Sequence, residues 1–294
     1  MNYSRVLILD FGSQVTKLIA RKIRELNIYC EILPYKTNIK NIKQISPDCI
    51  ILSGSPASVH DKKPPKPDLN IFDLDLPILG ICYGAQFLSK ILGGKVAKSK
   101  TREFGPSKLK KISNSKLLKN IKNNEISWMS HGDTIVKLPN KIKAIAKSEF
   151  GTISLFSSSD FMIVGTQFHP EVAHTAFGQQ FLKNFLVDIV GCKQNWKPEK
   201  LVNQKIKEIK ELVGKDIAIS AISGGVDSSV SSVLVSKAIG RRLKCFIVDT
   251  GLMRCNEVKE ILPVLKSLGV KPKVINAGPL FLGRLKGIVD PERK

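Results

Sequence analysis

Short apolar runs alternate with longer amphipathic runs along the first third of the chain. Residues 5–10 (RVLILD) form an apolar run of strand length, and residues 13–27 follow with apolar side chains at helical spacing. Three further apolar runs continue the pattern: CEILPY (30–35), DCIILSG (48–54) and PILGIC (77–82). Strands that alternate with helices build βαβ units, so we predict an α/β fold whose parallel sheet carries helices on its faces.

The pattern is less regular between residues 97 and 165. The runs SKLKKIS, EISWMSHGDTIVKL and KAIAKSE predict shorter strands in this region. Residues 178–191 (GQQFLKNFLVDIVG) then return to helical spacing, and Gly191 is placed to end that helix.

A polar junction, CKQNWKPEK (192–200), precedes a second alternation, so we predict a domain boundary near Asn195, with domains over 1–195 and 196–294. The predicted elements of the second domain are a helix at 198–214, a strand at 216–223, a helix at 225–240, a strand at 243–249, a helix at 256–269 and a strand at 271–277. Pro263 is expected to interrupt or restart the last helix. Three strands are few for a stable doubly wound sheet.

The composition narrows the class of protein. With 294 residues, of which 43% are hydrophobic, the chain can fill two sizeable cores. Its apolar runs are too short for a membrane span or a signal peptide, which predicts a cytoplasmic protein without membrane contact. The six cysteines include no CxxC pair, which argues against a zinc site and against a disulfide framework.

The net charge of +22 has two interpretations. A basic chain can bind nucleic acid. The lysines are spread along the whole chain, however, and no nucleic-acid-binding motif accompanies them. We therefore favour a compositional origin of the charge, with attraction of anionic nucleotides as a compatible consequence.

Residues 80–86 read GICYGAQ, at the end of a predicted strand and the start of a predicted helix. This spacing matches a nucleophile elbow with a thiol in place of the serine, in which the sharp turn needs the small neighbours Gly80 and Gly84. The start of the helix presents its positive end to Cys82 and favours the thiolate. The backbone N–H of Tyr83 can then contribute to an oxyanion hole.

A nucleophile needs a base, and the chain has four histidines: His60, His131, His169 and His174. The best placed is His169, because an apolar strand ends there and Pro170 favours an extended backbone. In an extended segment the side chain of Glu171 points to the same side, where it can orient the imidazole. For His131 two roles remain open, lining the site or supporting its loop. His60 and His174 are predicted at the surface.

The segment SGGVDSS follows a predicted strand and opens a predicted helix. Its residues are Ser223, Gly224, Gly225, Val226, Asp227, Ser228 and Ser229. The two glycines let the backbone approach a phosphate, the N–H groups at the helix start face an anion, and the serines add hydroxyl donors. Asp227 can hold a Mg²⁺ ion bound to the phosphates. The Walker A pattern is absent, so the sequence predicts a phosphate loop of another type.

These motifs resemble known families. GICYGAQ with HPE is similar to the class I (triad) glutamine amidotransferases, and SGGVDSS resembles the ATP pyrophosphatases. In this order, and with LDFGSQ, REFG, WMSHGD, HPEVAHT and VDTGLMR, they resemble the glutamine-hydrolysing GMP synthases over essentially the whole chain. The resemblance implies a flavodoxin-like amidotransferase domain over 1–195. It implies that 196–294 begin a Rossmann-like adenine nucleotide alpha-hydrolase domain, whose remainder and whose C-terminal dimerisation domain are absent.

The resemblance also implies the chemistry. Cys82 attacks the side-chain amide of glutamine, His169 shuttles the proton, Glu171 orients His169, and a thioester is hydrolysed. ATP, with Mg²⁺ at Asp227, adenylates xanthosine monophosphate (XMP), and ammonia displaces AMP to give GMP. Gln86 matches a position that helps to hold glutamine, and the amide of residue 55 matches the second oxyanion-hole donor. The full-length family is expected to be homodimeric.

The sequence departs from the family pattern at three positions and at its end. Ser55 stands where the family usually has glycine, Pro106 follows REFG, and Thr250 stands where asparagine or histidine is common. The early end predicts that this chain alone does not make GMP. The alternatives are a chain with glutaminase activity only, or a non-catalytic basic remnant that binds nucleotides or nucleic acid.

Overall fold

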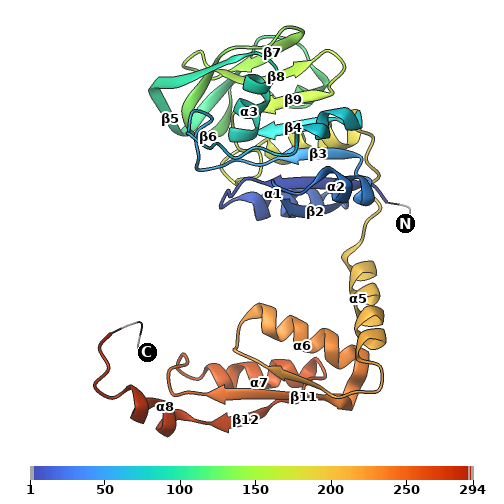
Figure 1. Cartoon of the computed structure of the whole chain (residues 1–294), viewed down its shortest axis with the longest axis vertical. Coiled ribbons are helices and arrows are strands. Elements are labelled where there is room, and N and C mark those ends of the chain that lie inside the picture. The colour runs from blue at the N-terminus through green and yellow to red at the C-terminus, as the bar shows by residue number, and fades with distance from the viewer. Residues whose placement is uncertain (1–2, 291, 293–294) are drawn as a thin grey trace. The chain divides into compact units, whose positions relative to one another are not determined.

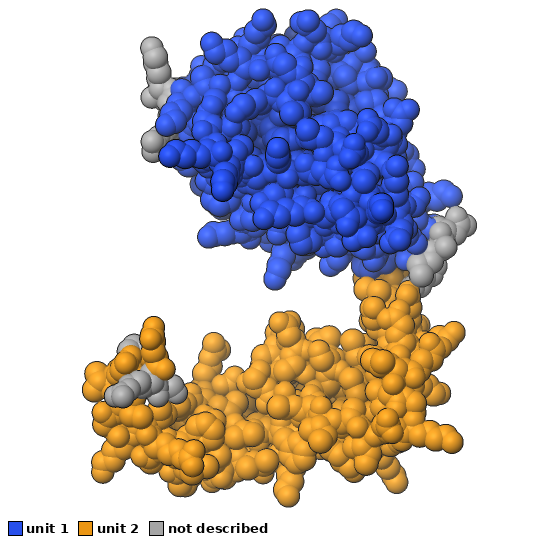
Figure 2. Space-filling view, in the orientation of Figure 1, with its two compact units in different colours: residues 1–196 blue, residues 197–294 orange. Residues whose placement is uncertain are grey.

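A computed structural model describes residues 3–290 and 292 of the chain. The chain divides into two compact units, Met1–Trp196 and Lys197–Lys294, which are shown in different colours in Figure 2. Each unit has a sheet and a hydrophobic core of its own, and each is described by itself.

The first unit is built around a nine-stranded mixed sheet (Figure 1). Its elements in chain order are β1 (Arg5–Asp10), α1 (Thr16–Glu25), β2 (Tyr29–Pro34), α2 (Ile39–Ile45), β3 (Cys49–Leu52), a 3-10 helix η1 (Leu69–Leu74), β4 (Ile78–Ile81), α3 (Tyr83–Ile91), β5 (Lys95–Lys111), a 3-10 turn η2 (Lys116–Leu118), β6 (Glu125–Lys137), β7 (Ile142–Lys147), β8 (Ile153–Ser158), β9 (Ile163–Thr166), α4 (Gly178–Lys183) and a π-helical turn η3 (Asn184–Ile189).

The sheet order is β2-β1-β3-β4-β9-β8-β7-β5-β6. The first five strands run parallel, as the alternating pattern predicts, while β8, β7, β5 and β6 join antiparallel. The expectation of a parallel sheet therefore holds for one half only. The other half is antiparallel because its strands are joined by turns and by the loop that carries η2, without the crossover helices that parallel strands need.

Alternate side chains of the parallel strands fill two cores, one on each face of the sheet. In β1, for example, Val6 and Ile8 pack with residues of α1, α4 and η3, whereas Leu7 and Leu9 pack with residues of η1, α2 and α3. Strands buried on both faces read as continuous apolar runs, which is why the sequence pattern identifies them well.

Two long strands replace the shorter ones expected after residue 97. Strand β5 has 17 residues and β6 has 13, and they pair as an antiparallel ribbon. The pairing register shifts between Lys98 and Glu103, and the ribbon also passes through Gly105 and Gly132. A bulge and two glycines break the alternation of apolar and polar residues without ending the strand, so the sequence pattern shows fragments.

The second unit has a three-stranded parallel sheet in the order β10-β11-β12. Its elements are α5 (Pro198–Val213), β10 (Ala218–Ala221), α6 (Val226–Ile239), a 3-10 turn η4 (Gly240–Arg242), β11 (Leu243–Asp249), α7 (Glu257–Ser267), β12 (Lys273–Asn276) and α8 (Gly278–Leu285). On one face Cys245 and Ile247 pack with residues that include Leu265. Ile219 of β10 remains 76% exposed.

Helix α7 is continuous through Pro263, so the predicted interruption is wrong. Proline removes one backbone donor, which leaves the carbonyl of Lys259 without its usual intrahelical bond. Both residues are exposed, so water can hydrate this carbonyl and the helix can continue.

Candidate active site

Cys82 occupies the turn between β4 and α3. Its backbone has φ +51° and ψ −104°, a left-handed conformation that is strained for a residue with a side chain. A Cβ atom added to Gly80 would lie 2.5 Å from the carbonyl carbon of Gly84, and one added to Gly84 would lie 2.5 Å from the carbonyl oxygen of Leu52. Both glycines are therefore required by the close approach of α3 to β3 and β4, and the turn has the geometry of a nucleophile elbow.

A cavity of about 390 Å³ opens beside the Cys82 side chain. It is lined by the loop after β1 (Gly12, Ser13, Gln14, Val15), the loop after β3 (Ser55, Pro56), Cys82, two residues of β6 (Trp128, Ser130) and the segment after β9 (His169, Val172). Strands β1, β3, β4 and β9 are neighbours in the sheet and end on the same side. The cavity thus lies at the carboxyl ends of parallel strands, where open α/β sheets bind ligands.

The imidazole of His169 is paired with the buried carboxylate of Glu171. The distance between Nδ1 and Oε1 is 2.7 Å. The backbone holds the imidazole in place, because the N–H of His169 donates to the carbonyl of Trp128 and its own carbonyl accepts from the Thr175 hydroxyl. Burial opposes protonation, but the contacts with Cys82 and Glu171 outweigh it and raise the pKa of His169 to about 10. The imidazole therefore holds its proton at neutral pH.

The predicted oxyanion-hole donors are the backbone amides of Tyr83 and Ser55. Tyr83 is the first residue of α3, so its N–H has no acceptor within the helix. Ser55 lines the cavity, and its hydroxyl accepts a hydrogen bond of 3.2 Å from the N–H of Ala57. The serine side chain thus completes a turn in its own loop, and its backbone lies outside the left-handed region. Replacement of the usual glycine is compatible with this loop conformation.

Gly54 is a site residue that the sequence analysis did not single out. A Cβ atom added there would lie 3.4 Å from Cε1 of His169 and 3.8 Å from Cβ of Cys82. The loop after β3 therefore contacts both the nucleophile and the imidazole. The glycine in SGSP was the available signal, although one sequence does not distinguish it from an ordinary loop glycine.

Gln86 does not line the cavity. It is buried, and its Nε2 donates to the carbonyl of Asp133 at 2.9 Å and to Oε1 of Gln167 at 3.4 Å. The structure therefore shows Gln86 in a polar network inside the unit and not against the cavity in which the resemblance places the substrate.

The remaining histidines have structural environments. His131 is buried with Glu103, at 3.8 Å between Nε2 and Oε2, and it does not line the cavity. Burial lowers the pKa of His131, against the attraction of Glu103. Of the two roles left open for this residue, support of its strand fits better. His60 and His174 are exposed, as predicted, and the ring of His174 lies 4.4 Å from that of Trp128.

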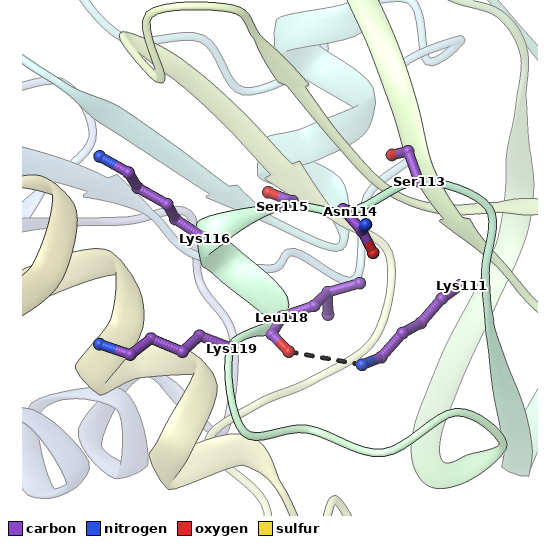
Figure 3. A pocket seen from close by; sticks show the side chains of 7 residues that line it. All are labelled: Lys111, Ser113, Asn114, Ser115, Lys116, Leu118 and Lys119. Atoms are coloured by element: carbon purple, nitrogen blue, oxygen red, sulfur yellow. Dashed lines mark hydrogen bonds between the residues drawn. The ribbon is translucent and has the colours of Figure 1, made fainter.

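A second cavity of the first unit, of about 410 Å³, has no comparable chemistry (Figure 3). Its lining residues are Lys111, Ser113, Asn114, Ser115, Lys116, Leu118 and Lys119. The amino group of Lys111 donates to the carbonyl oxygens of Leu118, as drawn in Figure 3, and Ile121. The lysine therefore supports a loop and is not presented to a ligand.

In the second unit, residues 222–225 join β10 to α6, and Val226 to Ser229 form the first turn of α6. Gly224 has φ +88°, and a Cβ atom added there would lie 2.8 Å from Oε1 of Glu257, so this position requires glycine. The hydroxyls of Ser228 and Ser229 donate to the carbonyl of Gly225 at 3.1 and 2.8 Å. The serines thus shape the loop, and the first turn of α6, with the exposed Asp227, is accessible to an anion.

The fold and the elbow define an amidotransferase of the triad type, and the comparison with known families agrees. The family described as "Glutamine amidotransferase class-I" matches residues 7–189, more than half of the chain, so the chain belongs to this family. A glutamine amidotransferase of Thermotoga maritima shares the fold, with a TM-score of 0.53 and 22% identity over 65% of this chain and 99% of its own.

More specific likeness is to GMP synthases, which confirms the resemblance found in the sequence. Over 98% of its length the chain is 48% identical to the glutamine-hydrolyzing GMP synthase of Chlorobium chlorochromatii. Over its whole length it is 44% identical to that of Caldicellulosiruptor saccharolyticus. The chain spans 58% of the length of each of these relatives. A solved structure from Thermoplasma acidophilum, assigned to a GMP synthase subunit, matches with a TM-score of 0.57 and 28% identity, over 69% of this chain and 99% of its own.

No helix within residues 3–290 and 292 is long and apolar enough to span a membrane.

Proposed function

We propose that the first unit hydrolyses glutamine to glutamate and ammonia, with Cys82 as the nucleophile. The observation that carries this proposal is the arrangement on one cavity of a cysteine at a strained elbow and a buried His169–Glu171 pair. A nucleophile, a proton-transfer group and a carboxylate that orients it are the three roles that acyl transfer requires.

The reaction proceeds in two halves. The Cys82 thiolate attacks the carbonyl carbon of the glutamine side chain, and the negative oxygen is stabilised by the amides of Tyr83 and Ser55. The C–N bond breaks as the protonated His169 gives its proton to the leaving nitrogen, which releases ammonia and leaves a thioester. Neutral His169 then takes a proton from water, the resulting hydroxide attacks the thioester, and the C–S bond breaks to give glutamate and the free thiolate.

Glu171 acts through His169. Its carboxylate binds Nδ1, which fixes the tautomer of the neutral imidazole and stabilises the imidazolium. The other ring nitrogen, Nε2, is then left to exchange protons with the nucleophile and the leaving group. The raised pKa of His169 fits a resting state in which the proton is already on the imidazole.

A glutaminase assay tests this proposal. Wild-type chain should release ammonia and glutamate in equal amounts from glutamine, and Cys82→Ala should release neither above background. A Cys255→Ala variant is the matched control, because Cys255 is an exposed thiol of the second unit. Equal trace release by wild type and Cys82→Ala would show that the cysteine is not the nucleophile.

We further propose that the ammonia serves the amination of XMP to GMP, with ATP bound at the Ser223–Ser229 loop of a Rossmann-like second unit. The support is the name of the relatives, together with the parallel β10-β11-β12 sheet and the glycine-dependent loop at the start of α6. The residues fit an anionic nucleotide, because Gly224 supplies the positive φ of the turn and the first turn of α6 is exposed to solvent.

Magnesium is proposed to bind with the nucleotide. Among the described residues no group of three or more His, Cys, Asp or Glu side chains is placed to hold a metal. Mg²⁺ is usually held by one or two carboxylates together with substrate phosphates. Asp227 is the carboxylate in the first turn of α6 that would hold it, and the ion would neutralise phosphate charge.

Incubation with XMP, MgATP and either glutamine or ammonium separates the alternatives. GMP formation from both nitrogen donors would assign the complete reaction to this chain. Ammonia release without GMP would assign glutaminase activity only. Nucleotide binding without either product would favour the non-catalytic alternative, for which titration with random DNA at two salt concentrations is the companion measurement.

A further inference from the structure

Gln167 is a buried residue beside the nucleophile that no step of the proposed mechanism uses. It follows β9 directly, is 1% exposed, and its backbone N–H donates to the carbonyl of Ser154 at 2.8 Å. Its side-chain Nε2 lies 3.7 Å from Sγ of Cys82. It does not line the cavity, so it reaches the sulfur from within the protein.

The hydrogen-bond network fixes which end of the Gln167 amide faces the sulfur. Gln86 donates from Nε2 to the carbonyl of Asp133, and a carbonyl can only accept, so this nitrogen is a true NH₂ group. The same NH₂ group lies 3.4 Å from Oε1 of Gln167. The oxygen of Gln167 therefore faces Gln86, and its NH₂ group faces Cys82.

The sulfur consequently lies between an acceptor and a donor with opposite preferences. The carbonyl of Ser130, at 3.5 Å from Sγ, can accept a hydrogen bond from a thiol but offers nothing to a thiolate. The NH₂ group of Gln167 can donate to sulfur, and a donor binds a charged acceptor more strongly than a neutral one. Because Gln167 is 1% exposed and does not line the cavity, loss of its NH₂ group leaves that side of the sulfur without a donor.

We propose that Gln167 is a positioning residue for the glutaminase reaction: its amide, oriented by Gln86, donates to the Cys82 thiolate and holds the sulfur in its attacking position. This inference rests on the proposed function of the first unit. It adds to His169 a second donor, which is neutral and keeps its hydrogens throughout the reaction. The charged group that also interacts with this sulfur is His169, and Glu171 is paired with His169.

The test is the rate at which iodoacetamide alkylates Cys82 as a function of pH, measured on the intact chain by mass spectrometry of the Cys82 peptide. Alkylation consumes the thiolate and needs no glutamine. Cys255 is an exposed thiol of the second unit and serves as the reference in the same sample. Gln167→Met keeps the length of the side chain but removes the donor. Gln180→Met is the matched control. The side-chain amide of Gln180 on α4 is also partly buried, but it donates to Asn184 on η3 and not to the sulfur.

We expect the pH of half-maximal Cys82 alkylation to lie about one unit higher in Gln167→Met than in wild type, which slows alkylation about tenfold at pH values below both midpoints. Cys255 in the same sample and Cys82 in Gln180→Met should react as in wild type. With glutamine as substrate, kcat should fall while KM changes little, because Gln167 does not line the cavity. Should Gln167→Met fail to fold, Gln167→Asn provides the test, since its amide stops short of the sulfur by about one bond length, ~1.5 Å.

The two proposals can fail separately. A slower Cys82 in Gln167→Met, in a chain that releases no ammonia, would show that Gln167 donates to the thiolate but would overturn the glutaminase function and with it the positioning role in that reaction. Glutamine hydrolysis by wild type, together with an unchanged Cys82 pH profile in both Gln167 variants, would overturn the positioning role alone. A loss confined to KM would also overturn it, because it would make Gln167 a substrate contact.

Discussion

Replacement of Glu171 by glutamine removes one negative charge from the buried pair and keeps the shape of the side chain. In the wild-type chain, burial works against the imidazolium, yet its partners Cys82 and Glu171 raise the pKa of His169 from 6.5 to about 10. A unit charge about 4 Å away contributes roughly 4 kcal/mol at an effective dielectric constant of about 20. At about 1.4 kcal/mol for each pH unit, this corresponds to about three units.

Loss of the Glu171 charge should therefore bring the pKa of His169 back toward its ordinary value, since burial persists while one attraction is gone. Protonated His169 is required to expel ammonia, so activity is lost as pH rises through the pKa. The alkaline limb of the kcat/KM profile, which reports the free chain, should begin near pH 10 in wild type and move down by about two to three units in Glu171→Gln. At pH 7.5 the imidazole of the variant stays partly protonated and kcat/KM should fall by less than about fivefold, whereas at pH 9 it should fall by about 10- to 100-fold.

The assay is ammonia release at glutamine concentrations well below KM between pH 5.5 and pH 10.5, with His131→Gln as the comparison. His131 is the other buried histidine whose charge acts on His169, but it does not line the cavity. A Glu171→Gln profile that keeps the wild-type alkaline limb, at whatever rate, would refute the reasoning, because the carboxylate would then not control protonation of His169.

Four further predictions concern stability and the second unit. Because His169 has a higher pKa in the folded chain than in the unfolded chain, its contribution to stability is fully present below about pH 6.5 and is lost as pH rises toward 10. Urea denaturation of wild type and Glu171→Gln at pH 6 and pH 9 will measure this loss. Gly84→Ala should destabilise the first unit by about 1–3 kcal/mol or more, because the added Cβ would lie 2.5 Å from the Leu52 carbonyl oxygen. In the same urea titration, Gly132→Ala should change the free energy of unfolding little, because no atom lies within 4 Å of its added Cβ. Asp227→Asn should weaken MgATP binding in a fluorescence titration and leave ammonia release unchanged; a parallel loss of ammonia release would contradict a site confined to the second unit. Pro263→Ala should raise the melting temperature of the second unit, because it restores the missing donor of α7, and an unchanged or lower value would show that proline is favourable there.

The sequence identifies the chemistry of the site better than its surroundings. Cys82, His169 and Glu171 can be recognised because their neighbours constrain the backbone: glycines flank the thiol, and Pro170 keeps the base and its carboxylate in an extended segment. Gln86 shows the limit of this approach. Its place after the elbow suggests a substrate contact, whereas its hydrogen bonds to Asp133 and Gln167 depend on strands that no local pattern brings together.

The distance between nucleophile and base is set by one pairing in the sheet. Strand β9 lies next to β4, with Ile81 opposite Thr166, although four strands of the sheet lie between them in the sequence. The N–H of Cys82 donates to the carbonyl of Thr166 at 2.7 Å, so the elbow is anchored on the strand that leads to His169. Periodicity predicts that both strands exist but not that they are neighbours. The antiparallel strands are inserted in the sequence between β4 and β9, but β9 still pairs with the edge of β4 that β3 leaves free. This pairing also places Gln167, the residue after β9, beside the sulfur of Cys82.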